Sequence, residues 1–422
     1  MRVLVLNNDH ITRQAARGLA ENGHDVSLSG KADDYGLTLD RLQGLLDRTR
    51  PDFCLMRNRR VLDRAFNPHA PDIEAYLCSN GIPCVSWFTE NPLAFGSLDS
   101  INYFFLRRDE NFLTLSFSPE TVEVLQGMGH KAAYLPLAAT SEWFRPAQDE
   151  ERGYVYDVTF IGRPKVAIPQ SWPGGKLAPL IQRSLYARHQ NVMTYFERRI
   201  LPRVTAEFLQ TLEEQPGLEL ESFDRMASRF GQDVNLFLVH QLQVHLMFEA
   251  ARLNMLKTVG WLVDAQVPIK LFGGHEWKEI FPQVGDAPVV PFEGQGEVYT
   301  RSKINLVLSK IELRDVVHER VFNIAACRGF AMAEHREAIL TLFPGGEIPT
   351  FGDREELLEK VRYYLDSEEE RRDLAGAAHE RVMREHTFPV RMEQMIRIVR
   401  AFLAGLQSHR CEGRGVCEAA SP

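Results

Sequence analysis

The chain has 422 residues, of which 44% are hydrophobic and 25% charged, and its formal net charge is −8. This length is more than one ordinary hydrophobic core accommodates, so the sequence predicts two domains. The negative net charge argues against a general nucleic-acid binder, which needs a basic surface, and we expect no nucleic-acid partner. No stretch approaches the ~20 apolar residues of a membrane span, and we expect no integral membrane segment.

The first residues and the cysteines both favour a cytoplasmic protein. The opening stretch MRVLVLNNDHITRQ contains an apolar run that is too short for a signal peptide and typical of a buried strand. The six cysteines are scattered without a Cys-x-x-Cys pair, which favours reduced thiols over a disulfide framework or a zinc site. We therefore expect a cytoplasmic location and no metal site.

Residues 1–145 alternate strand and helix signals at the spacing of βαβ units. Strands joined by helices are parallel, because a connection of this length returns the chain to the same sheet edge. This half is therefore predicted to be a doubly wound, Rossmann-like domain. Its predicted strands are 2–6, 25–28, 52–56, 83–88, 113–117 and 132–137, with helices near 11–21, 39–48 and 118–127.

The same alternation returns after a polar, proline-containing linker at 140–153, so residues 146–405 are predicted to form a second Rossmann-like domain. Its predicted strands are 154–161, 268–272, 288–291, 304–308, 330–333 and 349–351.

A long stretch at about 164–250 carries almost no strand signal and is predicted to be a helical insertion in the second domain. The helix expected at 233–262 is apolar on more than one face, so it is buried against its own chain or against another subunit. This leaves a homodimer through the insertion open. The last segment, 406–422, is small and polar and is predicted to be a disordered tail.

Ligands of open α/β sheets bind beyond the carboxyl ends of the strands, and these loops line one cleft if the two sheets face each other. On the first domain, Glu90 follows the strand at 83–88. A carboxylate at this position acts as a general base, binds a sugar hydroxyl, or only accepts hydrogen bonds from backbone N–H groups of the turn. His10 follows the first strand, where it transfers a proton near neutral pH or caps the next helix. Glu90 and His10 are the candidate catalytic residues.

On the second domain, the helix predicted at 318–328 begins with His318, and its amino end is suited to bind phosphate. Arg320 in the first turn can hold two phosphate oxygens at once, although it is also compatible with a solvated arginine on an ordinary helix. Gly162 directly follows a strand and allows close approach of a ligand, and Arg163 and Lys165 supply positive charge.

Several common nucleotide-site motifs do not occur in the sequence. It contains no Gly-x-Gly-x-x-Gly and no Walker loop, so dinucleotide binding of the usual type has no support. It also contains no Asp-x-Asp, which argues against a divalent-metal site of the kind that binds sugar nucleotides through such a pair of carboxylates.

Four stretches of the second domain carry a resemblance to a known family. They are YTRSKINLVLS (299–309), ERVFNIAACRG (319–329), LFPGGEIPTFGDREELLEKVRYYL (342–365) and AGAAHERVMREHTFPVRM (375–392). Together with YDVTFIG (156–162) and the glycine turn LFGGHEW (271–277), which contains Gly274, they resemble the group 1 glycosyltransferases, especially the branch named after spore-maturation proteins. The linker YLPLAATSEWFRP (134–146) and the stretch VSWFTENP around Glu90 are similar to segments of the same proteins.

The resemblance implies a GT-B fold, in which two Rossmann-like, doubly wound domains face a cleft. The donor nucleotide then lies in the C-terminal domain, usually without a metal, and the first domain is on the acceptor side. A helix with the pattern Arg-x-Phe-Glu holds the ribose through its glutamate in this family. Arg320 matches the arginine, Asn323 stands at the glutamate position, and Asp315 stands at a second family glutamate eight positions earlier. Asn323 can still hydrogen-bond a ribose hydroxyl, but it lacks a charge-assisted bond worth ~1.5–3 kcal/mol.

The predicted function is therefore transfer of a sugar from a nucleotide-sugar donor to a glycan, protein or small-molecule acceptor, without metal or cofactor. Arg163, Lys165 and Arg320 are expected to stabilise the leaving diphosphate. One alternative is a sugar-nucleotide epimerase on the same scaffold, which would use Glu90, His10 and His275. Another is a non-catalytic scaffold that binds nucleotide sugars, for which Asn323 and the insertion are the motivation.

Overall fold

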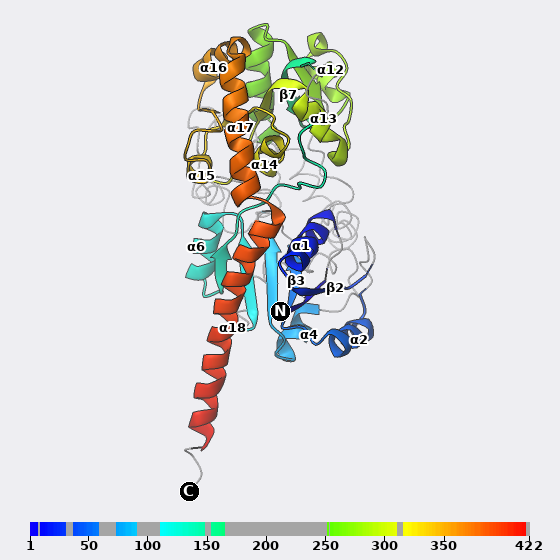
Figure 1. The fold of residues 1–422 in the computed structure, drawn as a ribbon, viewed down its shortest axis with the longest axis vertical. Helices are drawn as coiled ribbons and strands as arrows, with labels where there is room; N and C mark the ends of the chain where they lie inside the picture. Colours follow the sequence, from blue (N-terminus) through cyan, green and yellow to red (C-terminus); the bar gives the residue numbers. More distant parts are fainter. Residues whose placement is uncertain are drawn as a thin grey trace, which may run out of the picture.

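The computed structural model describes residues 1–6, 9–30, 37–58, 73–90, 110–147, 153–164, 251–252, 254–309 and 315–418. Within these ranges the chain forms two parallel β-sheets flanked by helices, one from each half of the sequence (Figure 1). This confirms the predicted α/β class with two doubly wound halves.

The first sheet is six-stranded and has the order β2-β1-β3-β4-β5-β6. All its pairings are parallel. Its strands are β1 Arg2–Val5, β2 Asp25–Leu28, β3 Phe53–Arg57, β4 Cys84–Phe88, β5 Phe112–Ser116 and β6 Ala132–Tyr134, and its helices include α1 His10–Glu21, α2 Leu39–Thr49, α4 Ile73–Ser79 and α6 Pro119–Gly127. The strand order reverses between β1 and β3, and such a switch point is where α/β proteins open a crevice for ligands.

The second sheet is five-stranded and has the order β11-β10-β9-β7-β8, so its switch point lies between β7 and β9. Its strands are β7 Tyr156–Ile161, β8 Ile269–Phe272, β9 Ser302–Val307, β10 Ala331–Glu334 and β11 Thr350–Phe351. Around it lie α12 Glu276–Ile280, η3 Pro282–Val284, η4 Phe292–Gly294, α13 Gln295–Thr300, α14 Glu319–Ala326, α15 Glu337–Leu342 and α16 Arg354–Asp366.

The prediction of a strand at 288–291 is wrong, because these residues join neither sheet. Pro288 and Pro291 have no backbone N–H to donate, so this stretch cannot complete a ladder with a neighbouring strand. It instead runs past the glycine turn that follows β8. There the carbonyl of Pro288 accepts from the backbone N–H of Gly273 at 3.0 Å.

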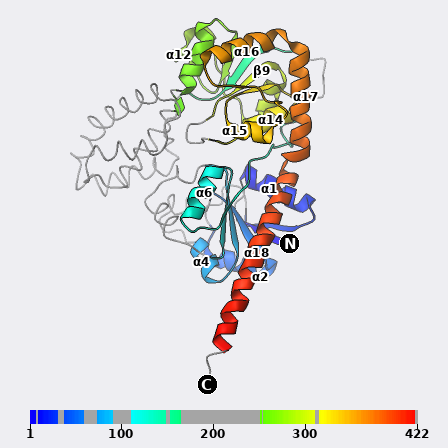
Figure 2. The ribbon, with the colours of Figure 1, turned by 90° about the vertical axis from the view of Figure 1, so that its left-hand side faces the viewer.

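Two C-terminal helices connect the halves. Helix α17 Glu368–Glu385 lies on the second half, and α18 Phe388–Glu418 returns along the first (Figures 1 and 2). The start of α18 packs tightly on α1, since a Cβ built at Gly18 would stand 3.0 Å from the backbone of Phe388. The amide of Asn22 donates to the carbonyl of Pro389 at 2.7 Å, and the ring of Phe388 meets Trp87 edge-on at 6.0 Å.

Helix α18 continues to Glu418, so most of the segment predicted to be a disordered tail is helical. No proline interrupts the chain between Pro389 and Pro422. A helix whose first turns are already docked propagates at little further cost, and this explains why a polar sequence remains helical here.

The predicted insertion at about 164–250 lies outside the described residues, and so does Lys165. The homodimer through the insertion and the domain boundary at 145/146 stay predictions. The residues that follow, 254–264, are helical, and Val259 and Leu262 from this helix are buried in an apolar cluster of the second half.

A single apolar cluster runs through both halves. It contains Val5 and Leu115 from the first sheet, Leu137 and Phe144 from the connection between the sheets, and Phe322 from α14. The start of α14 is thereby held against the first half by packed side chains. None of the described helices has both the length and the apolar character needed to span a membrane.

Candidate functional site

The carboxyl edge of the first sheet carries a charged cluster centred on Arg57, the last residue of β3. Its guanidinium lies 3.5 Å from the carboxylate of Asp9, across the switch point between β1 and β3. It also lies 3.8 Å from the carboxylate of Glu90, and its Nε donates to the hydroxyl of Thr89 at 2.8 Å. The side chain of Glu90 is 45% exposed, so it keeps one face toward solvent. Arg57 therefore orients two carboxylates at the edge where ligands bind in such sheets.

His10 stands beside this cluster but does not cap α1. The carboxylate of Asp9 accepts from the backbone N–H groups of Ile11 and Thr12, both at 3.0 Å, so the capping alternative for His10 is wrong. The His10 ring instead packs against both Trp143, at 6.1 Å, and Phe292, at 5.3 Å, measured between ring centroids.

Burial lowers the pKa of His10 below its ordinary value of 6.5, and the charge of Arg57 acts in the same direction. Asp9 and Glu319 raise the pKa, but their effects are smaller. The imidazole is therefore neutral at pH 7 and able to accept a proton. Because Phe292 belongs to η4, its contact with His10 shows that the second half reaches this edge of the first sheet.

The N-cap residue of α14, His318, already accepts hydrogen bonds from the first backbone N–H groups of the helix. Nδ1 of His318 accepts from the backbone N–H of Arg320 at 3.2 Å, and the carbonyl of His318 accepts from the N–H of Val321 at 3.0 Å. Glu319 places a negative charge in the first turn. These contacts weaken the prediction that backbone N–H groups of this turn bind phosphate. The half-buried guanidinium of Arg320 and the imidazole of His318 are the better candidates.

The side chain of Asn323 is bonded within the protein, which gives its predicted role at the ribose no support. Its side chain is 1% exposed, and its Oδ1 accepts from the backbone N–H of Thr140 at 3.0 Å. The Oδ1 atom of Asn323 is thus used by a protein donor, and a ribose role for this residue stays a prediction. The physical reason for its burial is that the connection between the sheets passes directly over this face of α14.

Asp315 also bonds within the protein. Its Oδ1 accepts from the backbone N–H of Ala338 at 2.7 Å, in the first turn of α15. The carboxylate thus satisfies a helix end that has no side-chain cap of its own. A ligand role for Asp315 stays a prediction and would involve its other oxygen.

The glycines of the second sheet edge fit against protein atoms. A Cβ at Gly273 would stand 2.2 Å from the carbonyl oxygen of Gly162, and a Cβ at Gly162 would stand 2.6 Å from the ring of Phe160. Trp277 donates its Nε1–H to the carbonyl of Gly162 at 2.7 Å, which ties the two loops together. Gly274 has φ +153°, and a Cβ there would stand 2.2 Å from the carboxylate of Glu276. These contacts account for the glycines without a ligand, and close approach of a ligand stays a prediction.

A second charged group, which is not among the predicted site residues, lies at the carboxyl ends of β9 and β10. The carboxylate of Glu334 accepts from the backbone N–H of Ser309 at 3.1 Å and from the amide of Asn254 at 3.2 Å, and it lies 3.4 Å from the guanidinium of Arg336. Arg163, after β7, is exposed, and among the described contacts none joins it to this group. The sequence feature that could have identified Glu334 as a site residue is its position at the end of an apolar strand. The same feature applies to Arg57, which ends β3.

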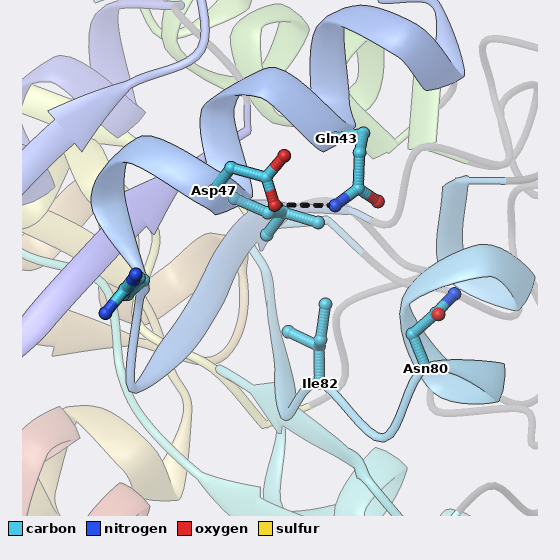
Figure 3. A pocket seen from close by; sticks show the side chains of 6 residues that line it. Gln43, Asp47, Asn80 and Ile82 are labelled. Atoms are coloured by element: carbon cyan, nitrogen blue, oxygen red, sulfur yellow. Dashed lines mark hydrogen bonds between the residues drawn. The ribbon is translucent and has the colours of Figure 1, made fainter.

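A pocket of about 450 Å³ lies at the opposite edge of the first sheet, between the ends of α2 and α4 (Figure 3). It is lined by Gln43, Leu46, Asp47, Arg50, Asn80 and Ile82. Gln43 donates to the carboxylate of Asp47 at 2.7 Å within one turn of α2. Because this pocket lies at the amino ends of β3 and β4, it is separate from the residues described above.

Comparison with known proteins locates a family match in the second half. Residues 247–397 match the family described as Glycosyl transferase-like. The match includes the second-sheet strands from β8 onward, α14 with Arg320, and the start of α18. No curated protein sequence matches the chain. The narrower resemblance to the spore-maturation branch stays a prediction.

Two solved structures share the fold over nearly the full length of both chains. A sucrose-phosphate synthase from Thermosynechococcus elongatus is 10% identical with a TM-score of 0.50, covering 96% of this chain and 100% of its own. A DNA-modifying β-glucosyltransferase, solved in the presence and absence of its substrate uridine diphosphoglucose, is 11% identical with a TM-score of 0.50, covering 94% and 99%. At such identities the likeness shows the fold alone, and that fold is GT-B.

Proposed function

We propose that the chain transfers a sugar from a nucleotide-sugar donor, held by the second half, to an acceptor held at the carboxyl edge of the first sheet. The observation that carries the proposal is the position of the family match. It includes α14 and η4, and the Phe292 ring of η4 packs on His10 at the edge of the other sheet. Uridine diphosphate glucose is the first donor to test, because the β-glucosyltransferase of similar fold uses it.

On the donor side, the diphosphate binds to the guanidinium of Arg320 and the imidazole of His318. Arg163, which follows β7, adds positive charge to the same edge, and Lys165 stands two positions later in the sequence, outside the described residues. A diphosphate leaves more readily when cations are already in position as its charge develops, since no reorganisation is needed during the reaction.

On the acceptor side, neutral His10 takes the proton from the attacking hydroxyl. Glu90, oriented by Arg57 at 3.8 Å, is placed to accept a hydrogen bond from a sugar hydroxyl or to act as the base in place of His10. The acceptor itself, whether a glycan, a protein or a small molecule, is identified by experiment.

The test is a panel of nucleotide sugars incubated with the full chain, with and without acceptor mixtures, scored for nucleotide release and for the sugar product. Release that depends on an acceptor supports transfer. An isomerised donor identifies an epimerase instead, and binding without turnover identifies a scaffold. Metal-independent transfer is part of the proposal, because the sequence contains no Asp-x-Asp and resembles a family that usually needs no metal. We therefore expect EDTA to leave the rate within about twofold of its value without chelator, and abolition by EDTA would contradict this part.

We expect Arg320→Ala to weaken binding of a nucleoside diphosphate by roughly 10- to 100-fold, because a charge-assisted hydrogen bond is worth ~1.5–3 kcal/mol. Calorimetric titration with UDP measures this. Arg362→Ala is the matched control, since Arg362 is an exposed arginine on α16. Equal affinities in the two folded variants would remove Arg320 from the donor site.

A further inference from the structure

Asn323 joins the proposed donor helix to the connection between the two sheets. Its Oδ1 accepts from the backbone N–H of Thr140, which is 183 positions earlier in the chain, at 3.0 Å. Asn323 is 1% exposed and Thr140 is 4% exposed. A backbone N–H at such a site has no water to replace a lost acceptor, so the bond strongly favours one arrangement of helix and connection.

The same connection is held from its other side by the C-terminal helices. The guanidinium of Arg391 donates to the carbonyl of Leu137 at 2.9 and 3.2 Å. The backbone N–H of Ala139 donates to the carbonyl of His386 at 2.8 Å. Residues 137–140 are therefore hydrogen-bonded both to α14 and to the region where α17 joins α18.

We propose that Asn323 is a positioning residue that couples occupancy of the donor site to the connection between the halves. Arg320 and Asn323 are three positions apart on α14, which is a single eight-residue helix, so a shift of the first turn also moves Asn323. Asn323 transmits that shift to Thr140 and hence toward Trp143, whose ring packs on His10. The part of this inference that concerns nucleotide rests on the proposed function.

The residue type fits this role. The acceptor must be polar, because it pairs with a buried N–H, and an uncharged amide avoids the cost of burying a carboxylate. The glutamate that the family resemblance places here would therefore be unfavourable at this site. We expect Asn323→Glu to destabilise the chain without improving donor binding.

The first experiment measures hydrogen–deuterium exchange of residues 138–144 without nucleotide. Asn323→Leu removes the acceptor at similar size, and exchange in this segment is expected to become about tenfold faster. Asn323→Gln keeps an uncharged amide acceptor and should restore slow exchange. Thr159→Val is the matched control, because Thr159 is 1% exposed and its bonds to Ser302 and Asn305 stay inside the second half. If Asn323→Leu does not fold, Asn323→Ala takes its place.

The second experiment repeats the exchange measurement with UDP at saturation, confirmed by calorimetry. In the wild type and in Thr159→Val, UDP is expected to change exchange of residues 138–144 by at least about threefold. In Asn323→Leu, UDP should bind with affinity within about threefold of the wild type but leave this segment unchanged, because the contact that transmits the shift is missing.

Three results would overturn the inference. If residues 138–144 of Asn323→Leu exchange at the wild-type rate without nucleotide, the hydrogen bond from Thr140 to Asn323 does not hold the connection in place. Loss of UDP binding in a folded Asn323→Leu, with Asn323→Gln no better, returns Asn323 to the donor site. A wild type that binds no UDP overturns the coupling together with the proposed donor site, while the measurement without nucleotide still decides whether Asn323 holds the connection.

Discussion

Replacing His10 with glutamine is expected to lower the rate of sugar transfer by roughly 10²- to 10⁴-fold, the usual contribution of a general base. Glutamine keeps hydrogen-bonding capacity and similar size, so UDP affinity and folding should stay near wild type. The readout is the initial rate with the donor and acceptor found by the panel. Glu90→Gln, made in parallel, distinguishes the two candidate bases, because the larger loss identifies the residue that takes the proton.

The pH dependence gives a second test of His10. Burial and the charge of Arg57 lower its pKa below 6.5, with Arg13 adding a smaller effect, while Asp9 and Glu319 oppose them. A general base works when deprotonated, so a lowered pKa keeps the rate high at pH 6.5, and the rate should fall only at lower pH. Arg57→Met removes a cation that lowers this pKa, so the acid limb of the profile should move to higher pH. An acid limb that is unchanged by Arg57→Met and persists in His10→Gln would assign the proton transfer to another group.

Most strands could be predicted because a buried parallel strand is a short apolar run bounded by turn residues. The segment 25–28 coincides with β2, and the strands predicted near 54, 86, 159 and 306 all occur. The segment 288–291 shows the limit of this approach. It carries valines typical of a strand, but its two prolines remove the donors that a ladder needs.

The functional residues were harder to predict, since sequence position specifies an element but not what its side chain faces. The start of α14 could be located, and so could the sheet edges that carry His10 and Glu90. The burial of Asn323 could not, because it depends on Thr140, far away in the chain. Arg57 was not chosen as a site residue, because its role depends on Asp9 and Glu90, which converge on it from the ends of two other strands.

The connection between the sheets is the feature that joins fold and proposed function. Side chains from α14 and α18 reach the same few residues, 137–140, from two sides. One of these contacts is a neutral amide and the other is a buried cation. Hydrogen bonds from a charged group contribute more to the free energy of folding than those of a neutral amide. The contact of Arg391 should therefore stabilise the connection more than that of Asn323.

Replacing Arg391 with methionine is expected to lower the free energy of unfolding by about 2–3 kcal/mol. The side chain is 1% exposed and burial lowers its pKa to about 10, so it is still charged at pH 7. Its guanidinium donates to the carbonyl of Leu137 and, at 2.9 Å, to Nδ1 of His386. Burial lowers the pKa of His386 to about 4, which keeps that nitrogen an acceptor. Methionine fills much of the volume but leaves both acceptors buried without this donor.

Urea denaturation, followed at the first unfolding transition, measures the loss. Arg397→Met is the matched control on the same helix, because Arg397 is 65% exposed and pairs only with Glu393 among its described contacts. An exposed pair of this kind contributes about 0–1 kcal/mol, so the control should stay close to wild type. Arg391→Lys keeps the charge with fewer donors and should fall between the two. If Arg391→Met were as stable as Arg397→Met, the cost of burying the guanidinium would equal the gain from its hydrogen bonds, and Arg391 would not be what holds residues 137–140 in place.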